Sequence, residues 1–278
     1  MQKLDSKTFD DLLRRSHVFD NGNAESVFDL TGVELITPAA LVQLAAAAHV
    51  LAGQGKNTVI EVDDDSVRSY LVRAGFITAI DGVAEIRPYL PSSGLLTLRG
   101  TNPLLIEVTK LTDASTLPEL LDQIVWVLQN RLSYKKYDAF DIATAVSEIS
   151  QNIFDHNLNI SGFLAMQVYN NGKFLEIGIA DNGDGLRNTL RRNRKYTHLS
   201  TDSDAIHHAI RLGTSEHDDA TRGTGLYHLL DLTYKHEGSV QIRSGTAKVR
   251  YRMDKKQGWV FAVPNMPGVQ IALTLPSK

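Results

Sequence analysis

The chain has 278 residues, a formal net charge of −3 at pH 7, 42% hydrophobic residues and no cysteine. This length allows one large domain or two ordinary ones, and the lack of cysteine excludes disulfides, thiolate catalysis and cysteine-based zinc sites. The mildly acidic balance gives no general electrostatic reason to expect nucleic acid or an anionic membrane as a partner.

The N-terminal stretch MQKLDSKTFDDLLRR is charged and has no apolar segment of the signal-peptide kind, so we expect a cytoplasmic protein. The longest run of low charge, LITPAALVQLAAAAHVLAGQG, is rich in alanine and is interrupted by Pro, Gln, His and Gly. We therefore expect it to form a helix of a soluble protein and not a membrane span.

Predicted strands and helices alternate from about residue 15 to residue 90. Residues 1–16 have the pattern of a short amphipathic helix, and the β-rich run ESVFDLTGVEL follows. Thr37 followed by proline fits a helix start, with Thr37 as the N-cap, and that helix is expected over 38–52. After the strand TVIEV, an Asp-capped helix is expected to stop at Gly75. This alternation predicts a small α/β domain over 1–90.

A segment rich in proline and glycine, PYLPSSGLLTLRGTNP, predicts a linker, placed at 91–103. Beyond it, long helices are expected near 115–132 and 138–157. The runs FLAMQVY and KFLEIGIA flank NNG, which is a strong hairpin signal. The C-terminal third has the pattern of several short strands with glycine-containing turns. Residues 104–278 are thus expected to form a second domain, a helix layer on a mixed, mostly antiparallel sheet.

Three motifs in this second half carry chemical groups. In SEISQNIFDH, the residues Glu148, Asn152 and His156 are four apart and share one helix face. DNGDGL, 181–186, ends a strand, and TRGTGLYHLL, 221–230, places two glycines before an apolar helix, where backbone N–H groups attract anions. Each motif alone is also compatible with an ordinary polar edge, turn or loop. A calcium loop is excluded for DNGDGL, because the twelfth position from its first Asp is Arg192 and not Glu.

In their order and spacing the three motifs resemble those of the GHKL ATPase superfamily. EISQN resembles the N box, DNGDG the first glycine box and RGTGL the second. The resemblance covers residues 104–278 and implies the Bergerat nucleotide-binding fold, with ATP and Mg²⁺ as cofactors. The sequence has no Walker motif, so the P-loop route to ATP is excluded.

The resemblance also implies roles for individual residues. Asn152 would hold a Mg²⁺ that bridges the phosphates, Asp181 would accept a hydrogen bond from the adenine amino group, and Glu148 would be the general base. Gly183 and Gly185 would let the backbone approach the base and the sugar. The remaining implied contacts are to phosphates: Arg222, Gly223, Thr224, Gly225 and Leu226.

Two further features follow from comparison with that superfamily. Residues 187–222 would form a lid over the nucleotide. Many members carry Thr or Ser on the last strand near the adenine, whereas the corresponding residue here is Gln270, so adenine hydrogen bonding would differ.

The N-terminal half resembles the STAS domain of anti-sigma-factor antagonists over residues 20–90. Members of that family carry an acceptor Ser at the start of the helix that begins here with Thr37, Pro38, Ala39 and Ala40. The Ser is absent, and Thr37 is expected to have a structural role as N-cap, so a self-phosphorylating switch is not supported. No histidine has the sequence context of a phospho-accepting histidine.

We therefore expect Mg-dependent ATP binding, with hydrolysis of ATP or transfer of phosphate to Ser or Thr of a partner in a regulatory switch. The alternative is a non-catalytic, ATP-gated interaction module or scaffold. A regulatory protein partner and a homodimer are both compatible with this reading. Membrane binding is not expected, and the charge balance argues against nucleic acid as a partner.

Overall fold

The structure is a computed structural model that describes all residues except 1, 21, 91–103, 157–159, 212–224 and 253–256. The linker expected at 91–103 therefore lies outside the described residues. Among the described residues, no helix is both long enough and apolar enough to cross a membrane.

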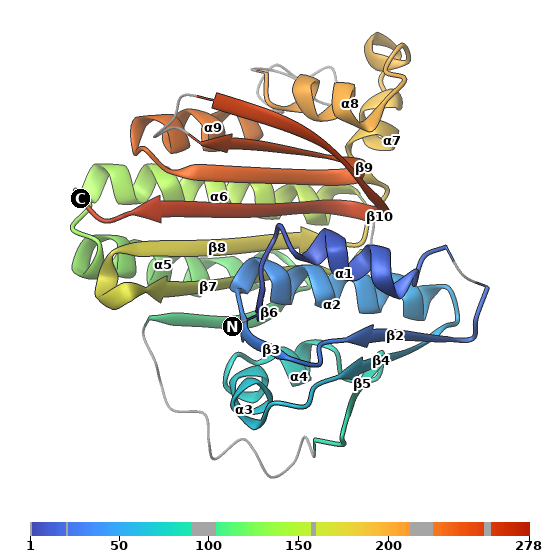
Figure 1. The fold of residues 1–278 in the computed structure, drawn as a ribbon. Helices are drawn as coiled ribbons and strands as arrows, with labels where there is room; N and C mark the ends of the chain where they lie inside the picture. The colour runs from blue at the N-terminus through green and yellow to red at the C-terminus, as the bar shows by residue number, and fades with distance from the viewer. Residues whose placement is uncertain (1, 21, 91–103, 157–159, 212–224, 253–256) are drawn as a thin grey trace.

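A five-stranded antiparallel sheet lies at the centre of the protein (Figure 1). In spatial order its strands are β6 (Leu105–Leu111), β7 (Gly162–Tyr169), β8 (Phe174–Asp181), β10 (Gln257–Pro276) and β9 (Ser239–Arg252). The hairpin expected at NNG is confirmed, because β7 and β8 pair across Asn170–Gly172. All three of these residues have positive φ, which Asn and Gly adopt more readily than other residues.

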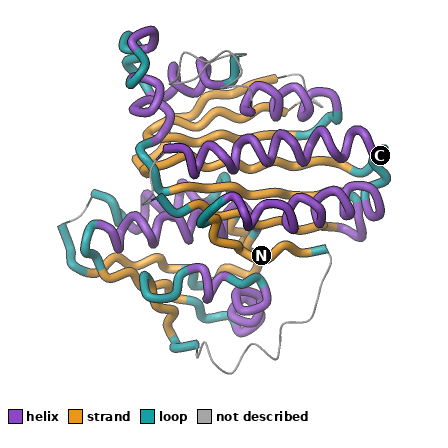
Figure 2. The backbone as a smooth tube through the Cα atoms, turned by 180° about the vertical axis from the view of Figure 1, so that it is seen from behind, coloured by secondary structure: helices purple, strands orange, loops and turns teal. Residues whose placement is uncertain are grey.

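Helices cover one face of this sheet, as Figure 2 shows from behind. They are α5 (Leu117–Arg131), α6 (Lys136–His156) and α9 (Gly225–Lys235), and the two long helices expected from the sequence are thereby confirmed. The apolar stripe of α6 is buried against the sheet at helical spacing: Ile142, Val146, Ile149 and Ile153. The observed layer is the helix-on-sheet arrangement that the sequence pattern predicts.

The N-terminal part packs on the opposite face of the sheet. Its elements are β1 (Gln2–Leu4), α1 (Phe9–Ser16), β2 (Glu25–Asp29), β3 (Val33–Ile36), α2 (Pro38–Gly53), β4 (Asn57–Glu61), α3 (Asp65–Arg73), α4 (Phe76–Ala79) and β5 (Ala84–Arg87). Strands β2, β4 and β5 form a parallel sheet, and β1 pairs with β3. The protein is therefore α/β, with its described parallel pairings confined to this part.

Helix α2 is buried on all sides, which explains its alanine-rich sequence. Thirteen of its sixteen residues are buried, and it contacts both the five-stranded sheet and the strands of the smaller sheet. One core cluster consequently includes residues from both halves of the chain, such as Phe28, Leu44, Phe163 and Ala180. Small side chains let a helix approach a sheet closely on either side.

The N-terminus of α2 rests directly on β8. A Cβ on Gly178 would lie 2.6 Å from the Cα of Ala39, so only glycine fits there. Beside it the Glu176 carboxylate accepts a hydrogen bond of 3.1 Å from the Ala39 N–H. Thr37 occupies the N-cap position as expected, but its side chain makes no capping bond. A carboxylate supplied by the sheet does this instead, and burial raises the pKa of Glu176.

Two expectations for local structure were wrong. Residues 1–16 do not form one helix: β1 comes first, and α1 begins at Phe9. The C-terminal third forms two long strands and not several short ones. Its glycines Gly245 and Gly268 have positive φ where the β9–β10 register shifts, so they permit bulges inside continuous strands and not turns between short ones.

We expect Gly178→Ala to lower the free energy of unfolding by about 1–3 kcal/mol, because the new methyl group meets the backbone of α2 and cannot be accommodated by a side-chain rotation. Urea unfolding measures the change. Gly53→Ala is the matched control: no atom lies within 4 Å of its added Cβ, and alanine favours helix. Equal stabilities of the two variants would contradict the close contact between α2 and β8.

Candidate functional site

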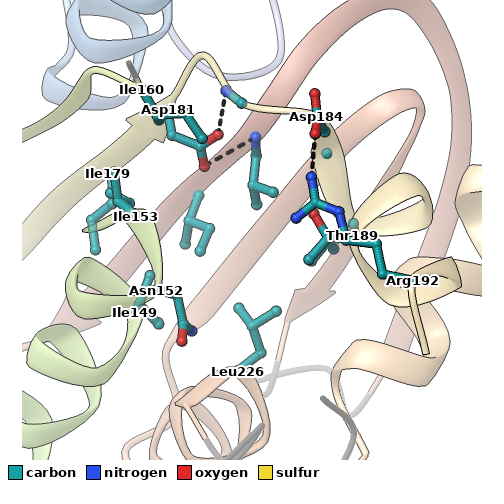
Figure 3. Close-up of a pocket in the computed structure, with 15 residues that line it drawn as sticks. Ile149, Asn152, Ile153, Ile160, Ile179, Asp181, Asp184, Thr189, Arg192 and Leu226 are labelled. Atoms are coloured by element: carbon teal, nitrogen blue, oxygen red, sulfur yellow. Dashed lines mark hydrogen bonds and ion pairs between the residues drawn. The ribbon is translucent and has the colours of Figure 1, made fainter. Parts of the chain in front are cut away.

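A pocket opens between the helix layer and one end of the five-stranded sheet (Figure 3). It is lined by residues from α6, β8, β10, α9 and α7 (Gly185–Arg191). Its walls are largely aliphatic: Ile149, Ile153, Ile160, Ile179, Leu226 and Ile271. Two polar groups that the sequence singled out, Asn152 and Asp181, also line it. An apolar pocket with a few placed polar groups is typical of a small-molecule site.

Strand periodicity explains why Asp181 reaches this pocket. Along β8, Leu175, Ile177 and Ile179 join the core beneath the helix layer, whereas Ala180 joins the core on the α2 side. Successive side chains of a strand point to opposite faces. Asp181 therefore falls on the helix-layer face, at the end of the strand where the sheet and α6 leave a space.

The Asp181 carboxylate is held by two backbone N–H groups. Its Oδ1 accepts from Gly183 at 2.8 Å and its Oδ2 accepts from Val269 at 3.2 Å, as the dashed lines in Figure 3 mark. Burial nevertheless raises its pKa to about 6, an effect to which the negative charge of Asp184 adds. Each carboxylate oxygen has a further lone pair, so the group can still accept from a ligand.

Glycines allow the backbone segments around Asp181, Ser244 and Gly268 to lie close together. Gly268 has φ +85, and a Cβ there would lie 2.0 Å from the Asp181 carbonyl oxygen. Gly185 has φ +77, and a Cβ there would lie 2.8 Å from the Ser244 hydroxyl. A Cβ on Gly183 would lie 2.9 Å from Ile160. Gly183 and Gly185, both proposed from the sequence, thus line the pocket and permit its shape.

Asn152 and Glu148 lie one turn apart on α6, but only Asn152 lines the pocket. Glu148 is half-buried beside the start of α9, where a Cβ on Gly225 would lie 3.1 Å from its Cβ. Its Oε2 is 3.9 Å from Nδ1 of His228. The structure therefore brings Asn152, Asp181, Gly183, Gly185 and Leu226 together around the pocket, with Glu148 and Gly225 next to it.

Sequence reasoning missed an ion pair at the mouth of the pocket. Arg192 of the segment after α7 lies 2.5 Å from Asp184, and both residues line the pocket (Figure 3). The motif DNGDGL contains this second Asp, to which the family resemblance assigns no role. The second Asp and a cation eight residues later, about two helical turns on, were the signal that could have indicated this pair.

The described part of the expected lid is packed and not a loose loop. Helix α7 and helix α8 (Asp202–Ala209) share a small core formed by Leu190, Leu199, Ala205 and Ala209. Asp202 fixes α8 to the edge strand β9, because its carboxylate accepts from the Thr246 N–H at 2.8 Å. The expected residues Arg222, Gly223 and Thr224 lie outside the described residues, as does the rest of the lid from 212 onward.

The expectation that Gln270 faces the pocket was wrong. Gln270 pairs with Ala180 on β8 and points to the α2 face. There it accepts a hydrogen bond of 3.1 Å from Arg243 and donates one of 2.9 Å to the Pro267 carbonyl. Its neighbours Val269 and Ile271 line the pocket instead. A shift of one residue along a strand reverses the face of every side chain.

A magnesium ion fits the donor set of the pocket only if phosphates supply most of its ligands. Among the described residues, no three His, Cys, Asp or Glu side chains are grouped to hold a metal. Asn152 is an exposed residue whose side-chain amide lies at the pocket, as Figure 3 shows. Mg²⁺ commonly takes one or two protein oxygens together with water and substrate phosphates.

No model of a known protein family matches this sequence, and no curated protein matches it significantly.

Asp181 is expected to make the free energy of unfolding fall as the pH rises. Its folded-state pKa is about 6, above the value of about 3.9 for an unfolded aspartate. The stabilisation from its proton is thus fully present below about pH 4 and lost as the pH rises through about 6. Urea unfolding of wild type and Asp181→Asn, at about pH 5 and about pH 7.5, should show wild type losing stability relative to the variant. A constant difference would contradict the raised pKa.

Proposed function

We propose that this protein binds ATP in the pocket, in a Mg-dependent manner, and hydrolyses it or transfers its phosphate to Ser or Thr of a partner. The observation that supports this most is the Asp181 carboxylate at the end of an aliphatic slot, with Asn152 further along the same slot. One end of such a site would take a flat base with an exocyclic amine. The other end would take phosphates and a hard cation.

Chemistry favours adenine for the inner end. Asp181 is a hydrogen-bond acceptor when ionised, so it accepts from the exocyclic amino group of adenine but meets only a carbonyl oxygen at that position in hypoxanthine. The flat faces of the base would pack between isoleucine side chains such as Ile153, Ile179 and Ile271. Burial of these faces supplies affinity, and the carboxylate supplies selectivity.

At the outer end, Asn152 would hold Mg²⁺ through its amide oxygen. When bound, the cation would neutralise phosphate charge and polarise the reacting phosphoryl group. Glu148, one turn earlier on α6, would take the proton from the attacking water or hydroxyl. The N-terminus of α9 begins at Gly225, beside Glu148, and helix N-termini attract phosphate groups.

This function goes with a fold assignment that we also propose. The helix layer on an antiparallel sheet, with the pocket between them, is what the resemblance to GHKL ATPases implies for residues 104–278. The N-terminal half would be a STAS-like module. Its Thr37 is 1% exposed and lies on the opposite face of the sheet from the pocket, so phosphate would go to a separate regulatory partner in the cytoplasm and not to Thr37.

Calorimetric titration with ATP and with inosine triphosphate, each with and without Mg²⁺, tests the base assignment. Wild type should bind ATP more tightly by about tenfold or more, because a hydrogen bond to a charged group contributes about 1.5–3 kcal/mol. Asp181→Asn should remove most of that preference. The matched control is Asp65→Asn, an exposed carboxylate on α3, which should behave as wild type. Equal affinity of wild type for both nucleotides would refute adenine recognition by Asp181.

Replacing Glu148 by Gln separates catalysis from gating. If Glu148 is the general base, turnover of ATP should fall by about 100-fold or more while ATP affinity stays within a few-fold. Phosphate release and calorimetry measure the two quantities, and Glu119→Gln on the exposed side of α5 is the control. Unchanged turnover would refute Glu148 as the general base, whereas no turnover in wild type that binds ATP would favour the non-catalytic, ATP-gated interaction module.

A further inference from the structure

A second cavity, of about 250 Å³, lies between α1 and the outer part of the β9–β10 hairpin. We call it the cationic cavity, and its charged and aromatic lining consists of Lys7, Asp10, Asp11, Arg14, Lys248, Arg250 and Phe261. It lies on the face of the sheet opposite the helix layer, where α1 packs on the sheet. It is therefore separate from the pocket proposed for ATP.

Strand periodicity gathers the cations on this face. Beyond the bulge at Gly245, the residues Ala247 and Val249 join the core under the helix layer. The alternating residues Lys248 and Arg250 therefore face the α1 side. Cations on an edge strand usually serve to discourage pairing with other sheets. That explanation does not cover Lys248, which is only 6% exposed.

Buried positive charge exceeds buried negative charge around Asp10, which lines the cationic cavity together with Lys248. Asp10 is 4% exposed and is shared by two buried cations. Its Oδ1 accepts from Arg243 at 3.1 Å, and its Oδ2 accepts from Lys248. Arg243 completes its bonds with neutral acceptors, among them Gln270. A single carboxylate between two buried cations leaves one positive charge without an anionic partner among these groups, which is costly in a low dielectric.

The rim carries further cations. Arg14 is paired with Asp11, at 2.5 Å, and Lys7 and Arg250 line the cavity close enough to repel each other. The pKa of Lys7 is lowered by partial burial and by the positive charge of Arg250, with Asp5 opposing this effect. Phe261, 40% exposed, supplies an apolar wall, and its ring centroid is 5.6 Å from Nζ of Lys248.

We propose that the cationic cavity binds a phosphate group, held by Lys7, Lys248 and Arg250. Ammonium and guanidinium groups that converge on a small volume match the several acceptor oxygens of phosphate, and such charge-assisted bonds are the strong ones. The apolar ring of Phe261 can pack against an organic group on that phosphate. The ligand is thus inorganic phosphate or a small organic phosphate, and it would tie α1 of the N-terminal part to the hairpin of the C-terminal part.

Two probes distinguish these sources: inorganic phosphate and phenyl phosphate, titrated by NMR into the full chain at constant ionic strength in chloride. Saturable shifts with either probe are expected in wild type. Tighter binding of phenyl phosphate would identify an organic phosphate as the ligand, and equal or weaker binding would identify the free ion. Lys7→Gln and Arg250→Gln should each weaken binding by about tenfold, the effect of one charge-assisted hydrogen bond.

The control Lys110→Gln changes an exposed cation on β6, remote from the cavity, and should leave binding unchanged. Asp181→Asn should also leave it unchanged, because that variant alters only the pocket proposed for ATP. Lys7 is exposed and its replacement should not unfold the protein, which a thermal melt verifies. The absence of saturable binding in folded wild type, or equal binding by Lys7→Gln, Arg250→Gln and Lys110→Gln, would overturn the proposal.

Discussion

The contact between β8 and the N-terminus of α2 is the constraint on which the rest of the structure depends. At Gly178 the helix backbone lies directly on the strand, and Glu176 supplies the acceptor that the first turn of the helix needs. Because α2 is buried on every side, it joins the smaller parallel sheet to the five-stranded sheet through one core. The next residues of β8 lead to Asp181, whose side chain lies on the other face. One strand thus holds the N-terminal part in place and presents the polar group of the pocket. Its sequence FLEIGIAD serves both purposes through simple alternation.

The sequence predicts best those features that are specified by residues close to one another along the chain. The helices near 115–132 and 138–157, the NNG hairpin and the Asp64 cap of α3 were confirmed, because each is specified by residues within a few positions of one another. Asn152, Asp181 and the glycines of DNGDG were brought together as expected.

Capping of α2 by Glu176 could not be predicted, since the two partners are 137 residues apart. Gln270 was assigned to the wrong face because bulges near Met266 change the register of β10, and bulges leave little trace in sequence.

Charge at the pocket is arranged so that one carboxylate is neutralised and the other is not. Asp184 at the mouth is paired with Arg192, whereas the carboxylate of Asp181, deeper inside, is held by the backbone N–H groups of Gly183 and Val269. Its raised pKa reflects this desolvated position. A carboxylate kept in such a position lowers stability at neutral pH, and groups held at this cost are found most often where a ligand uses them. The aliphatic side chains around it in the slot need no hydrogen-bond partner. The proposal of adenine recognition rests on this contrast between a buried carboxylate that can still accept a hydrogen bond and a largely aliphatic wall.

The two proposed sites lie on opposite faces of one sheet, and the β9–β10 pair connects them. Val269 of β10 holds Asp181 in the pocket, and one residue later Gln270 accepts from Arg243 in the buried charge cluster behind the sheet. A phosphate in the cationic cavity would fix α1 against the outer part of the same two strands. Gly268 lies at the bulge, against the Asp181 carbonyl. The two residues that follow it contact opposite faces of the sheet, Val269 on the pocket side and Gln270 on the side of the charge cluster. If both ligands bind, their affinities must influence each other to the extent that each one alters this short segment, and the influence must be equal in both directions.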